Sequence, residues 1–128
     1  MNIAILNAEA GGNKGAEAML EVLIIELLKN IPDVKLFLEV GGKEVYYKTV
    51  FLKRFDNKNI ELIKFTPKNM LSPFGDSIKN ISCAIDIGGI NFHDSGSYRA
   101  TLRNLIRFKP FLQNDKKLIF FTQDIGPS

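Results

Sequence analysis

Three short glycine-containing stretches hold the residues of this chain that could do chemistry. They are GGNKG over 11–15, GGINFHDSG over 88–96 and TQDIGPS over 122–128, and each follows a short apolar run. Glycines at such places let a backbone approach a ligand closely, and amides at a helix start commonly face an anion. Around the first stretch, however, Glu9 and Glu17 are offset only by Lys14. A bound phosphate is therefore not favoured there.

The first stretch also gives part of a dinucleotide-binding pattern. Gly11, Gly12 and Gly15 precede a predicted helix, and Glu39 closes the second predicted strand, where a ribose-binding acid would stand. The G-x-G-x-x-G order is broken, and the neighbouring glutamates would repel a pyrophosphate. A tight turn between strand and helix would explain the same glycines without a ligand. We therefore expect no bound cofactor.

The second stretch contains the single histidine, His93, beside Asp94. A histidine in a cleft can exchange protons near neutral pH, which makes His93 the candidate catalytic residue. The alternative is that Asp94 or Ser95 caps the next helix while His93 lies on the surface. One cysteine, Cys83, and one histidine are too few for a zinc site, so no metal is expected.

The composition is that of a single soluble domain over 1–128. The chain is 45% hydrophobic and 24% charged, with a net charge of +3. Its lysines are scattered, which argues against nucleic acid as a partner. The most apolar segment, MLEVLIIELL, is short and carries Glu21 and Glu26, so it is not expected to span a membrane. No signal peptide is visible, and we expect a cytoplasmic protein, with the inner face of the membrane as a further possibility.

Apolar runs and helical spacing alternate along the chain. The predicted strands are Asn2–Asn7, Val34–Val40, Ile60–Phe65, Ser82–Ile87 and Leu118–Thr122. The predicted helices are Ala16–Asn30, Lys43–Phe55 and Ser97–Leu112, the last kinked or ended by Pro110, with a loop and short helix over Pro67–Asn80.

This alternation predicts an α/β fold, a Rossmann-like three-layer sandwich whose five-stranded parallel sheet has the order 3-2-1-4-5. Strands one and four would then be neighbours, with a switch point between them where ligands of such sheets bind. The three glycine-containing stretches should converge there on one cleft. The residues expected to line it are Asn13, Gly15, Gly88, Gly89, Asn91, His93 and Gln123.

The three stretches, read together and in order, resemble those of the polysaccharide pyruvyl transferase family. They are GNKGAEAML, AIDIGGINFHD and FFTQDIGPS. The resemblance covers nearly the whole chain but only the first half of a family member. It implies the N-terminal half of a two-domain architecture like that of GT-B glycosyltransferases. It also implies transfer of pyruvyl from phosphoenolpyruvate to two hydroxyls of a sugar, as a ketal.

On this interpretation the partners are phosphoenolpyruvate and a sugar or lipid-linked glycan. Asn13 and Glu17 suit a hydroxyl-rich acceptor, because amides and carboxylates hydrogen-bond to hydroxyls. The middle stretch has Gly88-Gly89-Ile90 where many relatives show a longer glycine run. Two alternatives stay open: half of a nucleotide-sugar glycosyltransferase, and a non-catalytic sugar- or nucleotide-binding module.

From the last residues we expect this chain to be part of a longer protein. The chain stops six residues after the fifth strand, without a helix to cover that side of the sheet. We expect apolar surface from Ile119 and from Phe120 or Phe121 to be exposed, and the isolated chain to self-associate and be inactive.

Overall fold

Five parallel strands form the centre of the molecule. The computed structural model describes residues 1–7, 14–40, 44–55, 59–64, 74–87 and 108–120. The sheet has the order β3-β2-β1-β4-β5, as predicted. Its strands are β1 (Asn2–Leu6), β2 (Lys35–Val40), β3 (Ile60–Lys64), β4 (Cys83–Asp86) and β5 (Lys117–Phe120). The prediction of a Rossmann-like α/β fold is confirmed.

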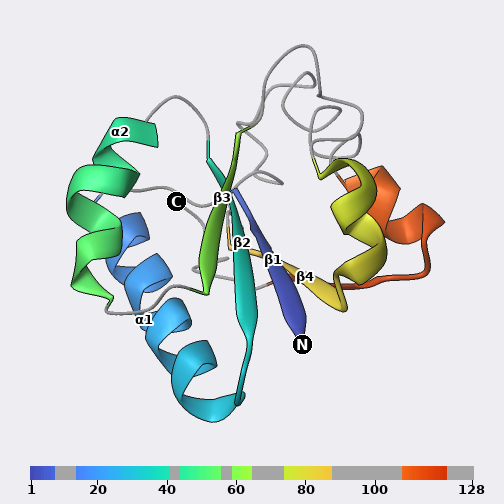
Figure 1. The fold of residues 1–128 in the computed structure, drawn as a ribbon, viewed down its shortest axis with the longest axis horizontal. Coiled ribbons are helices and arrows are strands. Elements are labelled where there is room, and N and C mark those ends of the chain that lie inside the picture. Colours follow the sequence, from blue (N-terminus) through green and yellow to red (C-terminus); the bar gives the residue numbers. More distant parts are fainter. Residues whose placement is uncertain (8–13, 41–43, 56–58, 65–73, 88–107, 121–128) are drawn as a thin grey trace, which may run out of the picture.

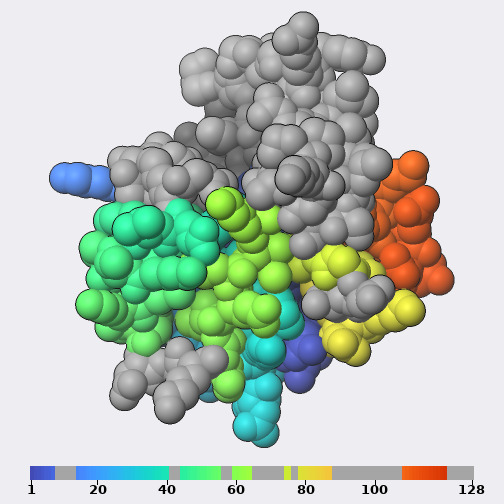
Figure 2. Space-filling model, turned by 45° about the horizontal axis from the view of Figure 1, so that its top comes forward, coloured from blue at the N-terminus to red at the C-terminus, as the bar shows by residue number. Residues whose placement is uncertain are grey.

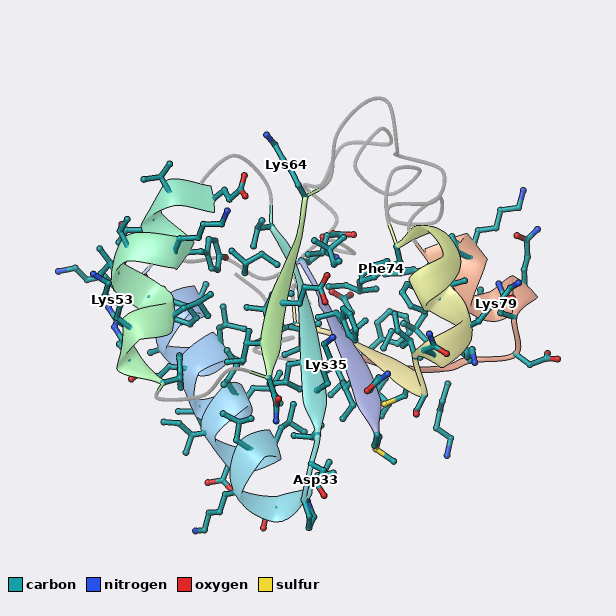
Figure 3. All side chains as sticks on the ribbon, in the orientation of Figure 1. Asp33, Lys35, Lys53, Lys64, Phe74 and Lys79 are labelled. Atoms are coloured by element: carbon teal, nitrogen blue, oxygen red, sulfur yellow. The ribbon has the colours of Figure 1, made fainter. Side chains whose placement is uncertain are left out.

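The register brings all five carboxyl ends to one edge of the sheet. Ile3 pairs with Cys83 and Leu6 with Asp86, which makes β1 and β4 parallel neighbours. On its other side β1 pairs with β2, up to Ile5 beside Leu38. Lys64, the last residue of β3, marks the carboxyl edge in Figure 3, and Asp33, just before β2, lies toward the amino edge.

Helices cover one face of the sheet, which is called the first face below. Helix α1 (Lys14–Asn30), predicted over Ala16–Asn30, buries Leu20, Leu23 and Ile24 on one stripe, as its apolar spacing requires. Alternate residues of the strands meet that stripe, because successive side chains of a strand point to opposite faces. The buried residues of this first core are Ile3, Ile5, Leu20, Leu23, Ile24, Val34, Leu36, Leu38, Val40, Tyr47, Phe51, Ile85 and Ile87.

The second helical segment beside α1 is less regular than predicted. The region Lys43–Phe55 is a short α-helix, α2 (Glu44–Tyr46), then a π-helical turn, η1 (Tyr47–Phe51), and a 3₁₀ turn, η2 (Leu52–Arg54). Aromatic and β-branched side chains fit poorly against a preceding α-helical turn. In the observed turns Tyr47 and Phe51 are both buried, with ring centroids 5.5 Å apart. The extent of the helix was predicted, and its α-helical type was wrong.

Two short helical segments cover the opposite face, on the right of the sheet in Figure 1. They are η3 (Gly75–Asn80) and the segment 108–113. Phe74 points toward the sheet in Figure 3 and contacts Phe111 edge to face, with centroids 5.4 Å apart. The buried residues of this second core are Ala4, Leu6, Phe37, Phe74, Ile78, Ile81, Ala84, Phe108 and Phe111.

Pro110 is expected to kink or end the helix. The segment 108–113 continues past Pro110, so the proline does not end the helix, and a kink stays a prediction because 97–107 lie outside the described residues. Proline lacks an N–H but keeps its carbonyl. Here the backbone N and the Nδ2 of Asn114 donate to that carbonyl at 3.3 and 2.7 Å. The helix then closes with Lys116 N donating to Phe111 O at 2.8 Å, across a left-handed Asp115. Most of the predicted helix, 97–107, lies outside the described residues.

The outer strands are less buried than the central ones. Figure 2 shows β3 at the surface between the two helical layers. On β5, Ile119 is 43% and Phe120 46% exposed, as predicted, while Phe121 lies outside the described residues. Among the described helices, none has both the length and the apolar character needed to cross a membrane.

Two left-handed residues allow a matched stability test. Asp115 has φ of 55°, and Gly75 has φ of 52° with no atom within 4 Å of an added Cβ. Left-handed backbone disfavours a side chain by about 1 kcal/mol or more, partly offset by the flexibility of glycine in the unfolded chain. We expect Asp115→Gly to raise the free energy of unfolding by about 0.5 kcal/mol and Gly75→Ala to lower it by a similar amount. Urea unfolding measures both, and changes of the same sign would contradict the explanation.

Candidate functional site

The described part of the carboxyl edge consists of strand ends and the first turns of the following helices. Of the predicted site residues, Gly15 and Glu17 lie in it, both in the first turn of α1. The others lie outside the described residues: Asn13, Gly88, Gly89, Asn91, His93 and Gln123. Their convergence on one cleft therefore stays a prediction.

Asn7 and Asp86 join the ends of β1 and β4. The Nδ2 of Asn7 donates to Oδ1 of Asp86 at 2.9 Å, although 79 residues separate them in sequence. Asp86 is fully buried. A carboxylate is buried at a high free-energy cost unless hydrogen bonds compensate it. This contact lies at the switch point that the strand order creates.

A second buried carboxylate lies on the other side of β1. Ile5 pairs with Leu38 and Leu6 with Asp86, so Glu39 lies in the same row, with Leu6 between the two acids. Glu39 is 4% exposed. Both acids point to the face of the second core, as Phe37 and Ala84 do, because residues two apart share a face. Their Cα atoms are about 10 Å apart, which is twice the spacing between strands.

These acids decide which ligands suit the edge near β1. At an effective dielectric constant of about 20, a unit negative charge ~6 Å from a carboxylate is repelled by about 3 kcal/mol. Both side chains point to the face of the second core, opposite α1, so this repulsion acts on an anion at the second-core side of the edge and not at the start of α1. Glu39 is buried within β2. On that side of the edge the two acids make the surroundings unfavourable for an anion.

Glu17 is held by residues that the sequence interpretation did not connect with it. Its Oε1 accepts a 2.7 Å hydrogen bond from the Tyr46 hydroxyl, and its Oε2 pairs with Nη2 of Arg54 at 3.2 Å. Arg54 also reaches Glu21 with Nη1 at 3.2 Å and lies over the ring of Phe51. Arg54 is therefore a second counter-charge to Glu17, in addition to the Lys14 identified from sequence.

Lys64 is a further cation at this edge that was not identified beforehand. It ends β3, and its Nζ lies 3.9 Å from Glu44 Oε2, while Lys48 contacts Glu44 Oε1 at 2.9 Å. Hydrogen bonding and charge from Lys48, together with the charge of Lys64, lower the pKa of Glu44. The signal was available, since a lysine that ends a parallel strand must lie at the carboxyl edge.

The described residues offer little for metal or thiol chemistry at this edge. No group of three or more metal-binding side chains occurs among them. Cys83 is the first residue of β4 and so lies at the opposite edge of the sheet. Burial raises the pKa of its thiol, so little thiolate forms near neutral pH.

Comparisons of the chain with protein-family models, with curated proteins and with solved structures find no match. The function must therefore be argued from the chain's own residues. The part of the edge that the structure describes contributes two buried acids, a cross-strand hydrogen bond and an anchored first turn of α1.

The contact between Glu17 and Tyr46 can be tested by titration. The hydrogen bond to Glu17, with burial and the Glu17 charge adding to it, raises the pKa of Tyr46. We expect Glu17→Gln to bring that pKa back toward its usual value near 10, because the amide carries no charge. Ring signals of Tyr46 followed by NMR above pH 9 measure the change. Glu21→Gln is the control, since Glu21 also pairs with Arg54; an equal fall in both variants would contradict the contact.

Proposed function

We propose that this chain is the N-terminal, acceptor-side domain of a polysaccharide pyruvyl transferase. The enzyme would move pyruvyl from phosphoenolpyruvate onto two hydroxyls of a cell-surface polysaccharide or its lipid-linked precursor. It would work in the cytoplasm, at the inner face of the membrane when its acceptor is lipid-linked. The proposal rests on the resemblance of the three stretches and on the chemistry of the sheet edge where they begin.

One observation carries the proposal: Glu39 and Asp86 are buried on either side of the end of β1. As carboxylates on the second-core face, they would repel a phosphate placed beside them on that face. A neutral sugar hydroxyl carries no charge for them to repel, and the buried acids themselves do not reach a ligand. The observation thus favours an acceptor site over a nucleotide site in this half of the protein.

The reaction defines what the site has to supply. The methylene carbon of phosphoenolpyruvate takes up a proton, and one sugar hydroxyl attacks the adjacent carbon. Phosphate then leaves, and the second hydroxyl closes the ketal. The step needs a general acid, for which His93 is our candidate, and cations around the phosphate and carboxylate. Asn13, Gly15, Glu17, Gly88, Gly89, Asn91 and Gln123 are the candidates for holding the acceptor.

To test the proposal, the full-length gene product is incubated with phosphoenolpyruvate and a panel of glycans, and the released phosphate is measured. We expect phosphate release that depends on the glycan. Release of nucleotide from a nucleotide-sugar would instead identify a glycosyltransferase, and binding without turnover would identify a binding module. Either of these results would overturn the proposal.

His93→Gln tests the general acid. Loss of a positioned proton donor typically lowers kcat by about 10²–10⁴-fold, and we expect a fall in that range. Lys53→Gln is the control, because Lys53 points away from the sheet on the outer side of η2 in Figure 3. Equal turnover by the wild-type protein and His93→Gln would exclude the proposed role of His93.

A further inference from the structure

The residue that follows β1 has an unusual backbone conformation. Asn7 has φ of 58°, in the left-handed region that side chains generally disfavour. Asp33 and Asp115 share this conformation, but both follow helical segments, where a left-handed residue commonly reverses the chain. Asn7 follows a strand, so helix termination does not explain its conformation.

The side chain of Asn7 supplies a different reason. Its Nδ2 donates to Oδ1 of Asp86 at 2.9 Å. At the same end of the strand pair, the backbone N of Ile87 donates to Leu6 O at 3.2 Å. Among the described residues, the side-chain bond therefore lies next to the last backbone bond between β1 and β4. Asp86 is fully buried, so it acts on a ligand through Asn7 and the strand ends and not by direct contact.

We propose that Asn7 and Asp86 are positioning residues that fix the direction in which the chain leaves β1 relative to β4. Glycine would adopt the left-handed conformation more readily but has no donor for Asp86. Aspartate would adopt it, as Asp33 and Asp115 do, but would place a second negative charge against Asp86. Asparagine meets both requirements, since it tolerates this conformation and donates a hydrogen bond.

This role also bears on acceptor binding, and that part of the proposal rests on the proposed function. The chain segments that follow β1 and β4 carry the candidate acceptor residues Asn13, Gly88 and Gly89. Holding the strand ends at the switch point would set the position of those residues relative to one another. The structural part of the proposal holds independently of which ligand binds.

Exchanging the two residues gives a sharp test. Asn7→Asp places a second carboxylate against that of Asp86. The double variant N7D/D86N restores a hydrogen bond between the two positions, with donor and acceptor exchanged and the amino-acid composition unchanged. Hydrogen exchange at the Ile87 amide, followed by NMR, reports the end of the strand pair. We expect exchange about tenfold faster in N7D, and within about threefold of wild type in N7D/D86N. The amide of Ile85, inside β4, should change less than that of Ile87.

A second variant covers the case in which N7D does not fold. Asn7→Gly keeps the backbone conformation and removes the donor, and it should also speed exchange at Ile87 about tenfold. Asp33→Gly is its matched control, because it makes the same backbone change at an exposed residue and should leave Ile87 unaffected. Exchange at Ile87 that is equal in wild type and N7G, or no recovery in N7D/D86N, would overturn the proposal.

Activity separates this proposal from the proposed function. In the full-length protein we expect Asn7→Gly to raise KM for the glycan about tenfold, with a smaller change in kcat, and N7D/D86N to return KM toward wild type. Absence of glycan-dependent phosphate release from the wild-type protein refutes the proposed function alone, and the exchange at Ile87 then decides the positioning role. An unchanged KM in an active Asn7→Gly protein would refute the link to acceptor binding.

Discussion

Burial of both faces of the central strands is the constraint on which this structure depends. A parallel sheet needs a crossover between successive strands and cover on each face. The chain meets this need with two cores: α1 and the segment 44–54 lie over one face, and η3 and the segment 108–113 over the other. Because every strand then runs in one direction, all the carboxyl ends collect at a single edge.

The carboxyl edge contains acidic side chains whose burial would cost free energy if they had no hydrogen-bond or ion-pair partners. Asp86 is buried but receives a hydrogen bond from Asn7, and Glu17 pairs with Tyr46 and Arg54. The first turn of α1 is thereby tied to the segment after β2, and the end of β1 is tied to β4. The chain segment between β1 and α1 thus has both of its attachment points fixed by side chains from other elements.

Much of the fold followed from local pattern. At the strand ends that the structure describes, the strands predicted from apolar runs agree with the observed ones to within about two residues, and the sheet order is the predicted one. The errors concern helix type and helix ends. Tyr47 and Phe51 are both buried in a π-helical turn, and the helix continues past Pro110, whose carbonyl accepts a hydrogen bond from Asn114. Propensity describes a residue in isolation, whereas these outcomes depend on what it packs against.

The sequence by itself determined the order of the elements, their apolar faces and the positions of the glycine-containing stretches, because these depend on neighbours within a few residues. Only the tertiary structure decided which polar side chains meet. Asn7 and Asp86 are 79 residues apart, and Arg54 and Glu17 are 37 apart. Their contacts exist because the strand order places β1 beside β4 and because the segment 44–54 packs beside α1. No local pattern encodes such a pairing, which follows from the assembly of the whole sheet.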